Sequence, residues 1–246
     1  MQTFKLTIEY DGTRYSGWQR QAEAPTVQAE IEKALAVMIR TAVTVHGAGR
    51  TDAGVHALGQ TASFRCDTRL DRDQILKGLN SLLPPDIAVL ECRRAPEEFH
   101  ARFSAKAKRY RYRVLNREIR SALERRNSWF VHRPLDLAAL LQAAGRLIGR
   151  RDFKAFESAG SPRAHTIRNV TAADWVHDPP SGLLLFHIEA DGFLRCMVRN
   201  IVGTLVAVGR GKLDPAGIDA ILASRDRRQA GPTAPACGLF LVVVRF

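Results

Sequence analysis

The sequence lacks the residue patterns that identify metal-binding and redox-active proteins. Its four cysteines include no C-x-x-C pair, and its seven histidines include no H-x-x-x-H spacing. The sequence therefore predicts neither a metal site nor a redox-active cysteine pair. The cysteines, Cys66, Cys92, Cys196 and Cys237, are widely scattered, which is typical of buried thiols in a reducing compartment.

Long apolar runs are also missing. No segment approaches the roughly 20 apolar residues that span a bilayer. The first residues, MQTFKLTIEYDG, lack the basic and then apolar pattern of a secretion signal, and they alternate like a strand. We therefore expect a cytoplasmic protein that does not enter a membrane.

Acidic residues are few relative to basic ones. The chain of 246 residues has 25 Asp and Glu against 37 Lys and Arg, which gives a formal net charge of +12 and a sequence pI near 10.2. This balance favours a polyanionic partner, with nucleic acid as the first candidate. A membrane surface fits less well because no basic amphipathic helix is evident. Solubility alone is the simpler alternative.

Hydrophobic periodicity organises the first part of the chain. It predicts strands at 2–11, 42–46, 58–65 and 86–94, and helices from Val27 to Met38 and across 75–83. Thr26 is placed to cap the first helix, and Pro84 and Pro85 end the second. The predicted order of elements is β-α-β-β-α-β.

Much the same order follows in the second part. Strands are predicted at 108–114, 166–176, 182–190 and 238–246, and helices at 136–149, 193–209 and, as a short insertion, 215–224. The arginine-rich residues 116–134 are expected to form a solvent-facing loop.

The repeated order predicts an α+β fold of two tandem ferredoxin-like, split β-α-β halves. We expect mainly antiparallel sheets that meet at a central cleft. The predicted division is an N-terminal half, 1–104, and a C-terminal half, 105–246.

The stretch HGAGRTDAGVHA, residues 46–57, places a single carboxylate, Asp52, among small residues and beside Arg50. A phosphate-binding loop fits poorly, because no G-x-G-x-x-G or G-K-[ST] completes it and a strand follows rather than a helix. Asp52 is alternatively a turn residue of the T-D-A-G type. In a third interpretation the segment is extended, so Arg50 and Asp52 point to the same side. The guanidinium then favours an ionised carboxylate that is able to act as a nucleophile.

Two further stretches combine cations with apolar or aromatic residues. In AKAKRYRYRV, residues 105–114, alternation places Tyr110 and Tyr112 on one face and arginines on the other. The tyrosines either stack on RNA bases or pack in a core. Arg195 and Arg199 are four residues apart, so in a helix over 193–209 they share one face. They either pair with surface acids or line the cleft opposite the carboxylate.

The stretch GRTDAGVHA, residues 49–57, resembles the signature of A-type tRNA pseudouridine synthases, which act in the anticodon stem-loop. Four other blocks look like the family's remaining blocks, in the same order: KLTIEYDGTRYSGWQRQ at 5–21, FHARFSAKAKRYRYRV at 99–114, FLRCMVRNIVGTLVAVGRG at 193–211 and APACGLFLVVVRF at 234–246. The resemblance therefore spans nearly the whole chain.

The resemblance implies a role for five residues. Asp52 would be the catalytic aspartate and nucleophile, and Arg50 would enter the base stack as the target uridine flips out. Tyr110 would lie against the uracil ring, and Arg199 would pair with the aspartate. Leu239 would pack under the base.

The resemblance also implies the reaction and the partners. Uridine is isomerised to pseudouridine at positions 38, 39 or 40 of tRNA, with no cofactor, metal or second substrate. The anticodon stem-loop would bind in the cleft of a homodimer, with one RNA lying across both subunits. Whether the aspartate attacks C1′ or C6, or first removes a sugar proton, stays open.

Two positions depart from the family pattern. Cys196 stands where many relatives have histidine, and Phe246 stands where many have tyrosine. Neither position carries the chemistry, so the expected difference is confined to helix packing or an RNA contact near Cys196. Two other functions are considered beside the isomerase: a noncatalytic RNA-binding module, and a hydrolase that releases uracil.

Overall fold

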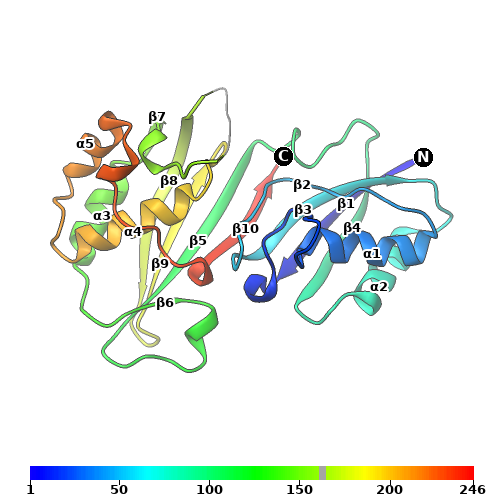
Figure 1. The fold of residues 1–246 in the computed structure, drawn as a ribbon, viewed down its shortest axis with the longest axis horizontal. Helices are drawn as coiled ribbons and strands as arrows, with labels where there is room; N and C mark the ends of the chain where they lie inside the picture. The colour runs from blue at the N-terminus through cyan, green and yellow to red at the C-terminus, as the bar shows by residue number, and fades with distance from the viewer. Residues whose placement is uncertain (161–164) are drawn as a thin grey trace. The chain divides into compact units, whose positions relative to one another are not determined.

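The computed structural model describes residues 1–160 and 165–246, and these residues form two compact units. Unit 1 consists of Met1–Lys106 together with Phe240–Phe246, and unit 2 consists of Ala107–Leu239. Each unit combines a sheet with helices, as Figure 1 shows, so the predicted α+β class is confirmed. The last strand of the chain belongs to unit 1. The sequence pattern had placed this strand in the C-terminal half, 105–246.

Unit 1 contains five strands: β1 (Gln2–Tyr10), β2 (His46–Gly47), β3 (His56–Cys66), β4 (Ile87–Ala95) and β10 (Leu239–Arg245). The sheet order is β4-β1-β3, with antiparallel pairing throughout. Strand β2 pairs antiparallel with β3, and β10 pairs with β3 in parallel. The predicted β-α-β-β-α-β order is the observed order of this unit's first six strands and α-helices.

The helices of unit 1 are α1 (Val27–Ile39) and α2 (Arg72–Leu82). The Thr26 hydroxyl accepts the Ala29 amide at 3.4 Å, which confirms the predicted cap. Alternate β1 residues, Phe4, Leu6 and Ile8, are fully buried. Figure 1 shows both helices beside the sheet of this unit.

The predicted strand at 42–46 is reduced to the two residues of β2. Helix α1 provides the reason, because its side chains replace a neighbouring strand. The Val45 amide donates to Glu32 Oε1 at 3.0 Å, and Gln28 Nε2 donates to the Val45 carbonyl at 3.1 Å. The backbone is therefore satisfied without a strand partner at this position.

Unit 2 contains the remaining strands: β5 (Ala107–Asn116), β6 (Trp129–Val131), β7 (Gly149–Asp152), β8 (Ile167–Asp178) and β9 (Leu183–Ala190). The order β5-β9-β8-β7 is antiparallel, and β6 pairs with β5 in parallel. The three longest strands confirm the predictions at 108–114, 166–176 and 182–190. The segment 116–134, predicted to be only a loop, contributes β6.

The α-helices of unit 2 are α3 (Leu137–Gly145), α4 (Met197–Gly209) and α5 (Gly217–Ser224). The described residues of the two units also form five short 3-10 turns, at Gly12–Arg14, Glu124–Arg126, Lys154–Phe156, Arg227–Gln229 and Ala236–Gly238. Among residues 1–160 and 165–246, no helix has both the length and the apolar character that a bilayer crossing requires.

Helix α4 begins four residues later than the sequence predicts. Cys196 precedes it with φ of +56°, in the left-handed region, so the helix cannot extend back through this residue. Arg195 lies outside the helix and donates from Nη1 to the Ala159 carbonyl at 2.6 Å. The prediction that Arg195 and Arg199 share a helix face is therefore wrong.

Candidate functional site

The Arg-Thr-Asp motif of unit 1 lies in the loop between β2 and β3. Thr51 is only 6% exposed, whereas Arg50 is exposed and Asp52 is half-buried. The threonine therefore points into the core, and its two charged neighbours lie on the outer side of the loop. This arrangement is the one that an extended segment requires.

A tight turn follows the aspartate. The Val55 amide donates to the Asp52 carbonyl at 3.1 Å, and Gly54 has φ of +76°. Glycine adopts this conformation without strain, which explains its place in the motif. The turn uses the backbone carbonyl of Asp52, whereas a nucleophile would use its side-chain carboxylate. The two interpretations therefore do not exclude each other.

Two side chains of the unit 1 core hold the loop from inside. The Tyr10 hydroxyl and the Thr51 hydroxyl share a hydrogen bond of 2.8 Å, and Gln60 Nε2 donates to the Gly49 carbonyl at 2.9 Å. Burial raises the pKa of Tyr10. The phenol stays protonated at neutral pH, so this bond persists there. The backbone is thereby fixed on both sides of Arg50.

The backbone of residues 12–18 packs directly against the loop. The Trp18 amide donates to the Thr51 carbonyl at 3.1 Å, and the Gly54 amide donates to the Tyr15 carbonyl at 3.2 Å. A Cβ atom on Gly17 would lie 2.5 Å from the Thr51 carbonyl oxygen. Only glycine permits this approach, and its φ of +94° also favours glycine.

The histidine of the motif is part of the core. His56 is 1% exposed, and its ring stacks on Phe240 with centroids 4.6 Å apart. Its Nδ1 lies 3.2 Å from the Gly12 amide and 3.1 Å from Asp11 Oδ1. One ring nitrogen cannot accept from the amide and donate to the carboxylate together. The amide always carries its hydrogen, so we assign Nδ1 as the acceptor.

In unit 2, strand β5 places two tyrosines on its buried face. Tyr110 is 6% exposed and meets Phe193 edge to face, with ring centroids 5.0 Å apart. Tyr112 is fully buried, and its hydroxyl donates to the Pro235 carbonyl at 2.7 Å. The predicted alternation of this strand is confirmed. Tyr112 also joins β5 to the segment 234–239.

Helix α4 is joined to that same segment through Arg199. Its Nε donates to the Ala234 carbonyl at 2.8 Å, and the Ala234 amide donates to the Arg199 carbonyl at 3.1 Å. Leu239, 5% exposed, lies at the end of the segment, where β10 begins. Unit 2 therefore connects the elements that carry Tyr110, Arg199 and Leu239.

The sequence pattern did not identify the hydrogen-bond network around Asn200, the residue that follows Arg199. Asn200 is fully buried, and its Nδ2 donates to the Phe156 carbonyl at 2.8 Å. Its Oδ1 accepts from Arg227 Nη2 at 3.0 Å and from the Thr233 hydroxyl at 2.6 Å. The signal that could have indicated this network was Asn200 itself, a polar residue in a mostly apolar helix.

Tyr10, Gln60 and Gly17 were also missed as supports of the loop. They lie in the stretch 5–21 and in β3, where alternation indicates only strand positions. Arg50 and Asp52 are placed in unit 1, and the other three predicted site residues are placed in unit 2.

A strongly basic α+β chain with an aspartate between an exposed arginine and a glycine turn fits a protein that acts on nucleic acid. Comparison with known proteins specifies the class. The family model described as tRNA pseudouridine synthase matches residues 6–104 and 143–246. The chain belongs to this family, which is a family of isomerases.

Curated relatives match the full length of the chain. A tRNA pseudouridine synthase A of Moorella thermoacetica is 47% identical over 248 residues, covering 100% of both chains. The Geobacter sulfurreducens protein of the same name is 46% identical and also covers 100% of both. That of Myxococcus xanthus is 45% identical, covering 98% of this chain and 91% of its own.

Proposed function

We propose that this protein converts uridine to pseudouridine in the anticodon stem-loop of tRNA, at positions 38, 39 or 40. The observation that supports this function best is the placement of Asp52. Its loop is fixed by the core through Thr51 and Gly49, so the outer residues are held in one arrangement. Family membership supplies the reaction and the RNA.

The reaction is an isomerisation. The bond between N1 and C1′ breaks, the uracil turns, and a bond forms between C5 and C1′. C5 loses its hydrogen and N1 gains one, so the atoms balance without a second substrate. One carboxylate, that of Asp52, serves as the nucleophile. A glycoside hydrolase would normally use two carboxylates flanking the bond.

The target base is stacked in the stem, so it has to be extruded before it reacts. We propose that Arg50, which is exposed, fills the space that the uridine leaves in the stack. Tyr110 would lie against the extruded uracil, and Leu239 would pack under it. Arg199 would pair with the catalytic aspartate. The net charge of +12 supports this function because it attracts RNA phosphates.

We further propose that the enzyme works in the cytoplasm as a homodimer, with one tRNA lying across both subunits. The family resemblance supports these proposals. The mass of the complex with tRNA in sedimentation gives the stoichiometry directly.

The deciding experiment is a map of pseudouridine in an unmodified tRNA transcript with uridines at positions 38 to 40. The transcript is incubated with the protein alone or with its Asp52→Asn variant, without added cofactor. Pseudouridine at those positions with the protein, but not with the variant, is the expected result. An active Asp52→Asn variant would contradict the role of the nucleophile.

Two other outcomes identify the alternatives. Salt-sensitive tRNA binding without pseudouridine would indicate a noncatalytic RNA-binding module. Release of free uracil would indicate a hydrolase. The binding is measured with the same transcript at several salt concentrations, and free uracil is measured in the incubation itself.

A further inference from the structure

Unit 1 has a hollow, away from Asp52, that the proposed reaction does not use. Its volume is about 390 Å³, and its lining includes His46, Ser63, Arg65, Glu98 and His100. It lies toward the end of β3, whereas Asp52 lies in the loop that leads into the beginning of that strand. His46, which lines the hollow, pairs with Ser63, and Tyr10, whose hydroxyl bonds Thr51, pairs with Ala57. Ser63 and Ala57 are six residues apart on β3, which is roughly 20 Å at about 3.3 Å per residue.

Three rings form a column at this hollow. The rings of His46 and His100 have centroids 4.8 Å apart, and those of His100 and Phe103 are 4.5 Å apart. The interplanar angles, 31° and 37°, are closer to stacking than to an edge contact. Phe103 is 76% exposed at the outer end of the column.

The column is held by a well-bonded turn. The fully buried Ala101 donates its amide to the Ser63 hydroxyl at 3.0 Å, which fixes the turn to β3. The Arg102 amide donates to His100 Nδ1 at 3.1 Å, and the Ser104 amide donates to the His100 carbonyl at 2.9 Å. The exposed ring is therefore presented by a fixed backbone, so binding to it costs little ordering.

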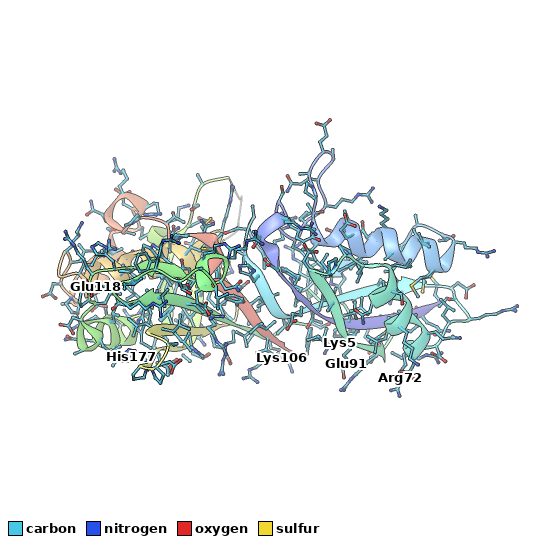
Figure 2. All side chains as sticks on the ribbon, turned by 90° about the horizontal axis from the view of Figure 1, so that it is seen from below. Lys5, Arg72, Glu91, Lys106, Glu118 and His177 are labelled. Atoms are coloured by element: carbon cyan, nitrogen blue, oxygen red, sulfur yellow. The ribbon has the colours of Figure 1, made fainter. Side chains whose placement is uncertain are left out.

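Cationic side chains lie beside the hollow and near its aromatic residues. The Arg102 guanidinium lies 5.5 Å from the Phe103 centroid, and Arg65 lines the hollow. Lys5, labelled in Figure 2, places its Nζ 4.0 Å from the centroid of Phe246. One acid, Glu98, lines the hollow as well. The positive charge and the flat exposed ring together complement a nucleotide, which has a negative phosphate and a flat base.

Burial, with a smaller contribution from His46, lowers the pKa of His100. The imidazole is thus neutral near pH 7, with Nδ1 accepting the Arg102 amide. A neutral His100 ring adds no positive charge to the column.

We propose that the column of His46, His100 and Phe103 binds an unpaired nucleotide of the same tRNA, outside the catalytic loop. The base stacks on Phe103, and Arg102 and Arg65 hold the phosphate. This inference rests on the proposed function for the identity of the RNA. Aromatic side chains that stack on unpaired bases beside cations are a general means of binding single-stranded RNA.

The test measures the affinity for an unmodified tRNA transcript at one fixed salt concentration, together with kcat and KM. Phe103→Ala is expected to weaken binding about tenfold and to raise KM, because it removes one stacking surface. Phe103→Trp is expected to keep or improve the affinity, and Phe103→Leu is expected to behave like the alanine variant. Val37→Ala is the control, since Val37 is also an exposed apolar residue of unit 1.

At saturating tRNA, kcat is expected to be unchanged in all four variants, because none of them touches the catalytic loop. Unchanged affinity in Phe103→Ala would overturn the proposal. If Phe103→Leu bound tRNA as tightly as the wild type, simple apolar contact rather than stacking would explain the binding. That result would also overturn the proposal. Dissociation of a dimer in Phe103→Ala would assign the surface to a second copy of the chain instead. Pseudouridine formation by the wild type is measured separately. A failure of the proposed function is therefore distinguishable from a failure of the proposed nucleotide site.

Discussion

The hydroxyls of Tyr10 and Thr51 meet at 2.8 Å in the core of unit 1, directly behind the loop that carries Arg50 and Asp52. Thr51 is the residue between Arg50 and Asp52, so this single bond sets the side to which both charged residues point. Strand β1 thus positions the proposed nucleophile without approaching the substrate. Measurements of kcat can separate such a positioning role of Tyr10 from a role in stability alone.

Tyr10→Phe removes the hydroxyl and keeps the ring. We expect a loss of about 1 kcal/mol in the free energy of unfolding and a fall in kcat of about tenfold, with KM for tRNA little changed. The control is Tyr15→Phe, which loses a hydrogen bond to Asp86 at 2.6 Å in the same unit. An equal effect of both variants on kcat would indicate that only stability is involved.

Most elements of the fold could be predicted from the sequence because their signals are local. Thr26 followed by spaced apolar residues predicted α1, and the alternation of 2–11 predicted β1. The failures arose where tertiary contacts replaced local preference. Gln28 and Glu32 took the place of a strand partner for Val45. The left-handed Cys196 shortened α4 at a residue with no such preference.

The candidate site was only partly visible for the same reason. Asp52 and Arg50 form a local pattern, two residues apart among glycines. Tyr10 contacts Thr51 across 41 residues of sequence, and no periodicity indicates that contact. The placement of Asn200 depends on Arg227 and Thr233, which follow it by about 30 residues. The roles of Tyr110, Arg199 and Leu239 came from the family resemblance and stay predictions.

The buried amide of Asn200 gives a prediction about stability. Asn200→Ala removes the donor to the buried Phe156 carbonyl and the acceptor of Arg227 and Thr233. We expect the free energy of unfolding to fall by about 2–4 kcal/mol, because a buried carbonyl is left unsatisfied and two partly buried hydrogen bonds are lost with it. Denaturation in urea measures this loss. Asn169→Ala, at an exposed position of β8, is the control and is expected to change stability by less than about 0.5 kcal/mol.

His187 on β9 gives a prediction about pH. Burial, followed by the charge of Arg111, lowers its pKa below the usual 6.5. The folded state therefore favours the neutral ring. Stability is fully present above pH 6.5 and declines as the pH falls through the lowered pKa, because the unfolded chain binds the proton first.

We therefore expect the wild type to lose more stability between pH 7.5 and 5.5 than His187→Gln does. Urea denaturation at several pH values measures the difference. His177→Gln, at the exposed histidine labelled in Figure 2, is the control and should follow the wild type. Parallel pH curves for the wild type and His187→Gln would contradict the prediction.

Gly17 and Gly211 offer a matched test of the close backbone contact between Gly17 and Thr51, in the loop that carries Asp52. Both have positive φ, +94° and +68°, so alanine is strained at either position. A Cβ on Gly211 meets no atom within 4 Å, whereas one on Gly17 lies 2.5 Å from the Thr51 carbonyl oxygen. We expect Gly211→Ala to cost about 1–2 kcal/mol of stability, with kcat unchanged.

Gly17→Ala should cost more than Gly211→Ala, because the backbone of the loop has to move away from the new methyl group. That movement displaces Asp52, the next residue, so kcat should fall at least tenfold while tRNA affinity is retained. Urea denaturation, tRNA binding and pseudouridine formation are measured on both variants. Equal stability and equal kcat in the two variants would show that the loop tolerates displacement. The close backbone contact would then have no role in positioning the nucleophile.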